Sequence, residues 1–315
     1  MSIDRVSVVG CGLVGIGWAA TFLARGLQVT CTDPAPGAEG RLREGVAADL
    51  CHLQIRSGLS AKAIDALRFE PDLAKAVRDA DWVQENGPET VDAKRDLIAA
   101  ISRGAPDNAV IASSSSSITV SAMQTEANRP ERVALGHPFI PVPLMALVEV
   151  AGGDLTAPAT LDRAMAFYRS LGKSPIRLKR EVPGHVGNRL QAALMREAFH
   201  LLQEGVASVE DIDLAVTEGP GARWAVSGPF ISHHLAGGAG GARRAFEHLG
   251  PALQAMWANL GTPSLTAELQ QKALEGIAQS LAARGALEPA EERVLVLHAI
   301  REAKKIFRER RAEND

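Results

Sequence analysis

The stretch RVSVVGCGLVG, residues 5–15, decides the fold of this chain. Its first half is a short apolar run typical of a buried strand, and glycines follow as Gly10, Gly12 and Gly15. Between a strand and a helix, the first glycine permits a tight turn, the second lets the backbone approach a pyrophosphate, and the third lets helix and strand pack closely. Because the start of such a helix also presents free N–H groups to phosphates, this turn predicts a dinucleotide site.

An acidic residue completes the dinucleotide pattern. The next strand-like run ends at Asp33, about 20 residues beyond the glycines. A carboxylate there accepts hydrogen bonds from both ribose hydroxyls and repels a 2′-phosphate, which favours NAD over NADP as the cofactor. The alternative is that the glycines only build turns and that Asp33 is a surface residue. The predicted NAD contacts in this part of the chain are Gly10, Gly12, Leu13, Val14, Gly15 and Asp33.

Strand-like runs alternate with helical stretches through the first half of the chain. This alternation is typical of a mainly parallel sheet covered by helices, so we predict an α/β, Rossmann-type domain. The expected strands are residues 5–10, 28–33, 82–85, 109–113, 133–137 and 147–151, and the expected helices include residues 90–103 and 157–171.

The pattern changes near Gly184. Beyond it strand-like runs nearly vanish, and residues 186–204 have the apolar spacing of a long helix. Ser208 is expected to cap the next helix, whereas the glycines and prolines of residues 219–229 and 237–241 predict loops. We therefore expect two domains: an NAD-binding domain in residues 1–184, and an all-α substrate and dimerisation domain in residues 185–315.

The bulk composition argues against several classes of protein. Apolar residues make up 46% of the 315 residues, and the net charge is -3 with both signs mixed along the chain. This gives no reason to expect nucleic acid or an anionic membrane as a partner. The 3 cysteines fit neither a disulfide framework nor a zinc site, and no metal is expected. Without a signal-peptide pattern or an apolar run of about 20 residues, a reducing, cytoplasmic location is expected.

A histidine and a carboxylate stand where a reaction centre is expected. His137 ends a predicted strand, and ligands of open α/β sheets gather at the carboxyl ends of strands. A neutral imidazole can take the proton of a hydroxyl near pH 7 while a hydride leaves the carbon that bears this hydroxyl. Glu149, in the next apolar run, needs a partner for its charge and can orient the ring. Spacing alone leaves a second interpretation open, in which His137 is a core histidine and Glu149 an edge residue.

Longer stretches carry a resemblance over essentially the whole chain. They are VSVVGCGLVGIGWA, QENGPETVDAKRD, IASSSSSI, GHPFIPVPLMALVEVAGG, GHVGNRLQAALMREAFHLLQEGVAS and EGPGARWAVSGPF. With them the sequence resembles the 3-hydroxyacyl-CoA dehydrogenase superfamily, and within it the branch of L-gulonate 3-dehydrogenase (lambda-crystallin) and L-carnitine dehydrogenase. The resemblance implies an NAD-dependent dehydrogenase that acts on the CH–OH group of a small 3-hydroxy acid, and a homodimer.

The resemblance also implies roles for single residues. His137 matches the family's catalytic base, and Glu149 matches the carboxylate paired with it. Ser116 matches the active-site serine, next to both substrate and cofactor, with Ser117 as the alternative because the serine run blurs the register. Ser116 and Asn188 are expected to donate to the oxygen that becomes a carbonyl. Two further matches, Glu89 and Lys94, imply residues that line the cofactor.

The substrate side departs from the family pattern at one place. The family reads His-x-x-Asn-Pro, whereas this chain has Ile140 where the asparagine is expected, and Ile140 can neither donate nor accept. We therefore expect an active enzyme with an altered pocket. Arg223 and Trp224 lie in a stretch similar to the gulonate and carnitine branch. Arg223 is a candidate for holding a free carboxylate, the alternative being that it braces a loop or an interface, and Trp224 is a candidate for an aromatic wall.

Two other functions stay open at this point. The first is 3-hydroxyacyl-CoA dehydrogenase activity on the same fold, which needs a basic groove for the CoA phosphates. The second is a weakly active NAD-binding structural protein of the lambda-crystallin type. The retained pair of His137 and Glu149 argues against the second, because a purely structural role does not need it.

Overall fold

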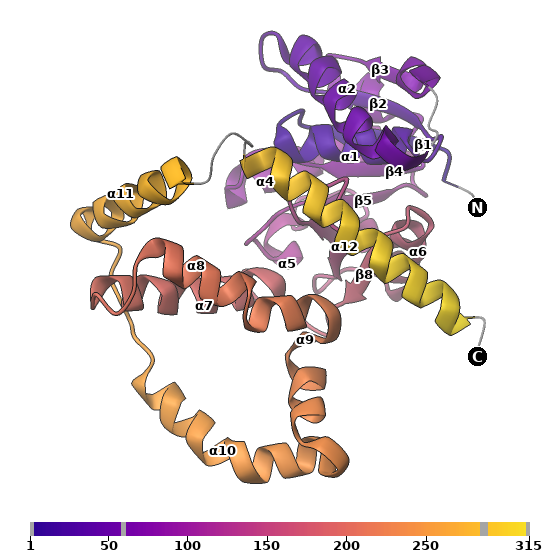
Figure 1. The fold of residues 1–315 in the computed structure, drawn as a ribbon. Coiled ribbons are helices and arrows are strands. Elements are labelled where there is room, and N and C mark those ends of the chain that lie inside the picture. Colours follow the sequence, from indigo (N-terminus) through magenta and orange to yellow (C-terminus); the bar gives the residue numbers. More distant parts are fainter. Residues whose placement is uncertain (1–2, 58–60, 284–288, 313–315) are drawn as a thin grey trace. The chain divides into compact units, whose positions relative to one another are not determined.

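The computed structural model describes residues 3–57, 61–283 and 289–312 of the chain, whose course can be followed in Figure 1. The chain divides into two compact units, and the division falls between Asn188 and Arg189. Within the described residues, no helix is both long and apolar enough to cross a membrane.

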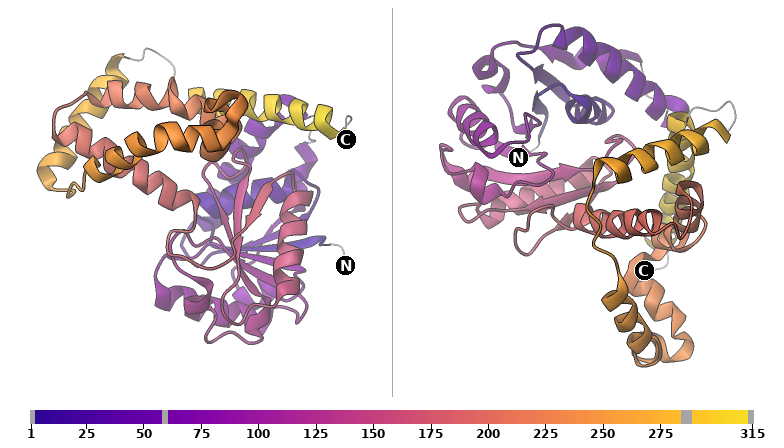
Figure 2. Two further views of the ribbon diagram at one scale, coloured as in Figure 1. Left: turned by 90° about the horizontal axis from the view of Figure 1, so that it is seen from below. Right: turned by 90° about the vertical axis from the view of Figure 1, so that its left-hand side faces the viewer.

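The first unit is built on one sheet, which Figure 2 shows from two further sides. Its strand order is β3-β2-β1-β4-β5-β6-β7-β8, and all neighbours are parallel except β6 and β7. This confirms the predicted α/β, Rossmann-type fold with a mainly parallel sheet. The strands are β1 (Arg5–Val9), β2 (Gln28–Thr32), β3 (Leu67–Phe69), β4 (Trp82–Glu85), β5 (Val110–Ser113), β6 (Val133–Pro138), β7 (Leu147–Ala151) and β8 (Ser174–Arg177).

Helices cover both faces of this sheet because successive strand residues bury side chains on opposite sides. Val8 belongs to a core cluster with side chains of α1, α2 and α6, whereas its neighbour Val9 belongs to a cluster with side chains of α3, α4 and α5. Large side chains such as Trp18 and Trp82 are fully buried there, and each stabilises the fold by roughly 2 kcal/mol. The helices are α1 (Leu13–Leu23), α2 (Ala38–Ser57), α3 (Leu73–Val77), α4 (Val91–Gly104), α5 (Val120–Met123) and α6 (Pro158–Ser170), with 3-10 turns η1 (Ala61–Ala66) and η2 (Pro130–Arg132).

The sheet topology brings the candidate residues to one edge. Strand β1 lies between β2 and β4, so the strand order reverses there, which is where doubly wound sheets bind ligands. Because β1, β4, β5 and β6 run parallel, the segments that follow them emerge at the same edge of the sheet. Those segments begin at Gly10, Asn86, Ser114 and Phe139.

The described part of the second unit contains helices and no strand. Ser208 caps α8 as expected, since its hydroxyl accepts from the N–H of Asp211 at 3.1 Å. The loop prediction for residues 219–229 was wrong. Pro220 begins α9, and the backbone breaks only at Gly228 (φ 66°, ψ 173°), because proline fits a first helical turn and Gly228 precedes a second proline. The helices are α7 (Gly187–Gln203), α8 (Val209–Thr217), α9 (Pro220–Ala236), α10 (Gly241–Asn259), α11 (Ala267–Ala283) and α12 (Pro289–Ala312), with the 3-10 turn η3 (Gly238–Gly240).

Candidate active site

The glycines after β1 form a cradle, the cofactor turn of residues 10–15. Gly10 has φ +92°, and a Cβ there would lie 2.6 Å from the carbonyl oxygen of Asn86. A Cβ at Gly15 would lie 1.9 Å from the carbonyl oxygen of Gly10. At Gly12, by contrast, a Cβ would meet nothing within 4 Å, and no side chain caps the start of α1. The turn therefore offers open space and helix N–H groups, which is what a pyrophosphate needs.

Asp33 follows β2 and is tied to the cofactor turn. Its Oδ2 accepts from the N–H of Cys11 at 2.7 Å, and its Oδ1 accepts from the N–H of Ala35 at 2.8 Å. Each carboxylate oxygen has a further lone pair for a ribose hydroxyl. Leu13, which is 67% exposed, and the half-buried Val14 begin the helix beside it. The residues present at this turn fit NAD.

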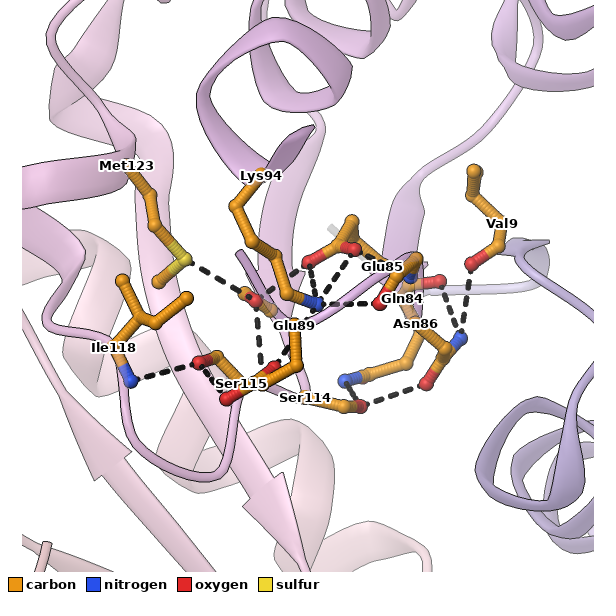
Figure 3. A network of polar contacts seen from close by, with 12 residues as sticks. Val9, Gln84, Glu85, Asn86, Glu89, Lys94, Ser114, Ser115, Ile118 and Met123 are labelled. Atoms are coloured by element: carbon orange, nitrogen blue, oxygen red, sulfur yellow. Dashed lines mark hydrogen bonds and ion pairs between the residues drawn. The ribbon is translucent and has the colours of Figure 1, made fainter. Parts of the chain in front are cut away.

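A buried ion pair supports the segment after β4 (Figure 3). Lys94 Nζ on α4 lies 2.9 and 3.1 Å from the two carboxylate oxygens of Glu85, and it donates to the carbonyl oxygen of Gly87 at 3.0 Å. Ser113 Oγ donates to the same carboxylate at 2.6 Å. Both charged groups are almost fully buried, so each compensates the charge of the other. Lys94 thus fixes the backbone that leads to Glu89.

Glu89 holds the turn that follows β5, the serine turn of residues 115–117. Its Oε1 accepts from Ser115 Oγ at 2.8 Å and from the N–H groups of Ser116 and Ser117 at 2.8 and 2.9 Å. The hydroxyls of Ser116 and Ser117 both lie 3.1 Å from that oxygen. Burial raises the pKa of Glu89, but the Ser115 hydrogen bond, the charge of Lys94 and the Ser117 contacts outweigh it, so the net pKa is lowered. A charged Glu89 thus fixes the turn.

His137 and Glu149 face each other on paired strands, β6 and β7. His137 Nδ1 lies 2.9 Å from Glu149 Oε2, and both side chains are buried. Glu149 Oε1 accepts from the N–H groups of Val186 and Gly187 at 2.8 and 2.9 Å. Burial raises the pKa of Glu149, but the bonds from His137, Gly187 and Val186 outweigh it, so the pKa lies below its usual value. The carboxylate therefore stays charged beside the ring.

The segment before α7, residues 184–188, is bonded to the serine turn. Asn188 Nδ2 donates to the carbonyl oxygen of Ser116 at 2.9 Å. His185 Nε2 lies 3.0 Å from the carbonyl oxygen of Ser115. His185 is not among the residues predicted from the sequence, because nothing in its spacing points to a partner. We call residues 184–188 the junction segment.

Three further residues singled out in the sequence are exposed. Ile140, 48% exposed, follows Phe139, whose ring centroid is 5.0 Å from that of His137. Arg223 and Trp224 lie on α9 of the second unit, and both are exposed. The first unit thus brings together the cofactor turn with Asp33, Glu89 with Ser116, and His137 with Glu149. Asn188 joins the serine turn through its side chain.

Family models cover most of the chain. The model of the 3-hydroxyacyl-CoA dehydrogenase NAD binding domain matches residues 5–182, and that of the C-terminal domain matches residues 184–280. The chain belongs to the 3-hydroxyacyl-CoA dehydrogenase family. Together with the fit of the cofactor turn, this makes it an NAD-dependent oxidoreductase that acts on the CH–OH group of its donor.

Individual relatives within this family are similar over most of their length. An L-carnitine dehydrogenase of Nocardiopsis dassonvillei is 43% identical over 100% of this chain and 97% of its own. That of Streptomyces coelicolor is 46% identical over 93% and 92%. Among solved structures, 5-formyl-3-hydroxy-2-methylpyridine 4-carboxylic acid 5-dehydrogenase, an NAD+-dependent dismutase, has a TM-score of 0.79 at 28% identity, covering 97% and 98%. The (S)-3-hydroxybutyryl-CoA dehydrogenase of Ralstonia eutropha has a TM-score of 0.64 at 31% identity, covering 72% and 82%.

Proposed function

We propose that this chain oxidises the secondary hydroxyl of a small 3-hydroxy acid to the keto acid, with NAD as acceptor and His137 as general base. The observation that carries the proposal is the 2.9 Å contact between His137 Nδ1 and Glu149 Oε2. A carboxylate only accepts, so the proton of the neutral ring lies on Nδ1, and the Nε2 lone pair is left to accept one. An imidazole in that tautomer is a competent base near pH 7.

In the proposed reaction, Nε2 of His137 accepts the proton of the substrate hydroxyl while a hydride leaves the carbon that bears this hydroxyl. NAD, when bound, supplies the acceptor for that hydride. The imidazolium formed on His137 is stabilised by the buried carboxylate of Glu149, which two backbone N–H groups hold in place. Glu149 thus orients the ring before the transfer and stabilises its charge afterwards.

Ser116 and Asn188 are proposed to donate to the substrate oxygen. The Ser116 hydroxyl lies 3.1 Å from Glu89 Oε1, farther than the Ser116 N–H group at 2.8 Å, and it can rotate to donate to a ligand. Asn188 uses one amide N–H on the serine turn and keeps a second to donate. Glu89 and Lys94 act on the cofactor side by fixing the backbone after β4 and β5, and the side chain of Glu89 is 37% exposed.

Among 3-hydroxy acids, we propose L-carnitine ahead of L-gulonate, because relatives at 41–46% identity carry the name L-carnitine dehydrogenase. Carnitine combines a carboxylate, which an arginine can hold, with a quaternary ammonium, which aromatic rings attract. Arg223 and Trp224 are the sequence-derived candidates for these two tasks. A cytoplasmic homodimer is also part of the proposal: the second unit exposes apolar side chains such as Phe230 (79% exposed), which suit a partner chain.

A substrate panel tests the proposal. Purified protein with NAD is given L-carnitine, L-gulonate and (S)-3-hydroxybutyryl-CoA, and NADH absorbance is followed. We expect turnover of L-carnitine, and His137→Gln should lower kcat by roughly 10² to 10⁴-fold, the usual contribution of a general base. His248→Gln, an exposed histidine of α10, is the matched control and should leave kcat unchanged. Preference for the CoA ester would replace the free acid as substrate, and full activity of His137→Gln would remove His137 as base.

A further inference from the structure

A second histidine lies beside the first. His185 is 2% exposed, and its ring centroid is 5.3 Å from that of His137. The proposed reaction gives it no role, since Nε2 of His137 takes the proton. Its backbone has φ +52°, a left-handed conformation that residues other than glycine rarely adopt. Such a conformation persists only where the surroundings over-determine it.

The hydrogen bond of His185 defines its protonation. The carbonyl oxygen of Ser115 can only accept, so Nε2 of His185 donates to it at 3.0 Å. Burial lowers the pKa of His185, and a protonated His137 lowers it further, against the opposing effects of the Ser115 contact, Glu149 and Glu89. The net pKa is below its ordinary value, so the ring is neutral near pH 7.

The junction segment donates hydrogen bonds to three consecutive carbonyl oxygens of the serine turn. The oxygens of Ser115, Ser116 and Ser117 accept in turn from the side chain of His185, the side chain of Asn188 and the backbone of Gly184, at 3.0, 2.9 and 3.4 Å. The same segment supplies the two N–H groups that hold Glu149. The proposed substrate donor Ser116 and the orienting carboxylate Glu149 are therefore fixed by one piece of backbone.

We propose that His185 is a positioning residue for the dehydrogenase reaction. Its Nε2–H bond to the carbonyl oxygen of Ser115 fixes the serine turn relative to the N–H groups that hold Glu149, and its uncharged ring lies beside that of His137. This inference rests on the proposed roles of His137 and Ser116. A positioning bond differs from a structural one in that losing it lowers kcat without weakening cofactor binding. It differs from a catalytic base in that an uncharged donor can replace it.

Two substitutions separate these roles. His185→Phe keeps a ring but loses the donor, whereas His185→Gln keeps an uncharged N–H donor and loses the ring nitrogens that titrate. We expect His185→Phe to lower kcat roughly tenfold, the effect of one hydrogen bond, and His185→Gln to recover activity to within roughly threefold of the wild type. The Kd of NADH, from its fluorescence, should stay unchanged in His185→Phe, and the acid limb of the kcat/KM profile should stay unchanged in His185→Gln.

Controls keep the outcome readable. Tm and near-ultraviolet circular dichroism establish folding, and if His185→Phe does not fold, His185→Asn replaces it, because asparagine tolerates the left-handed backbone and its amide lies closer to the main chain. His248→Phe is the matched control. Wild-type kcat in His185→Phe or His185→Asn, equal losses in the donor-lacking variant and His185→Gln, or a shifted acid limb in His185→Gln would each overturn the inference. Failure of the proposed function would instead appear as full activity in His137→Gln, whatever the His185 variants do.

Discussion

The cofactor turn, residues 10–15, and the base, His137, lie at the same edge of one sheet but are fixed over different distances along the chain. The turn takes its shape from its own glycines, and its more distant bonds go to two adjacent residues: Gly10 N–H donates to the carbonyl oxygen of Thr32, and Cys11 N–H donates to Asp33. His137 depends on Glu149 of the next strand, which depends in turn on the N–H groups of Val186 and Gly187. Cofactor binding should therefore be altered by local substitutions, whereas chemistry should be sensitive to remote ones.

The largest effect that sharpens this comparison is expected from Glu149→Gln. The amide is similar in shape but uncharged, so it does not stabilise the imidazolium, and its NH2 group can donate where the carboxylate only accepts. We expect kcat to fall by roughly 10² to 10³-fold, with the Kd of NADH unchanged, measured by steady-state kinetics and NADH fluorescence. Glu39→Gln, on the exposed start of α2, is the matched control. Equal losses in kcat and in NADH affinity would contradict the separation of the two regions.

The same variant has a defined pH signature. The folded pKa of Glu149 lies below its ordinary value of 4.5, so its charge contributes stability above that pH and loses it as the pH falls through the folded pKa. The difference in free energy of unfolding between wild type and Glu149→Gln should therefore be largest near pH 7 and shrink in acid. Urea unfolding at several pH values measures it, and a difference that grows in acid would contradict a charged Glu149.

The next largest effect is expected from Asp33→Asn, which tests the cofactor region alone. Hydrogen bonds to a charged group contribute roughly 1.5 to 3 kcal/mol, so the KM for NAD should rise by about ten- to a hundredfold. The amide oxygen of asparagine can still accept from Cys11, so the turn should keep its shape, and kcat at saturating NAD should change little. Asp79→Asn, on the surface, is the control. A large loss in kcat at saturating NAD would show that the two regions are coupled.

The sequence predicted the cofactor region more completely than the base region. Local residues determine the shape of the cofactor region, whereas residues far along the chain hold the base. The spacing of Gly10, Gly12 and Gly15 by itself predicts the tight turn and the close backbone approach that they allow. The pair of His137 and Glu149 could be proposed, but no pattern indicates that Val186 and Gly187 hold the carboxylate. The short edge strands β3 and β8 were missed because their residues are few and partly exposed.

Two other features come from context that a single sequence does not carry. The role of Lys94 on the cofactor side stays a prediction, and the sequence does not indicate that its ammonium group binds Glu85 and the carbonyl oxygen of Gly87. The glycines and prolines of residues 219–229 predicted a loop, because each is unfavourable inside a helix. In the structure α9 packs against α8 and α10, and its backbone leaves helical geometry only at Gly228.

The smallest effect is expected from Tyr168→Phe, in the polar network behind the site. The Tyr168 hydroxyl donates to Gln84 Oε1 at 2.8 Å, and burial raises its pKa, so it acts as a neutral donor. Gln84 Oε1 keeps a second partner, Trp82 Nε1 at 3.2 Å. Losing one of two donors should therefore lower the free energy of unfolding by only about 1 kcal/mol, measured by urea denaturation.

Activity should not change in Tyr168→Phe, and this is the sharper half of the prediction. Gln84 Nε2 also donates to the carbonyl oxygen of Gly136 at 3.2 Å, the residue before His137. If that contact only stabilises β6, kcat and both KM values stay at wild-type levels while stability falls. A loss of kcat at constant NADH affinity would instead show that His137 also depends on Tyr168, through Gln84 and Gly136, in addition to the junction segment.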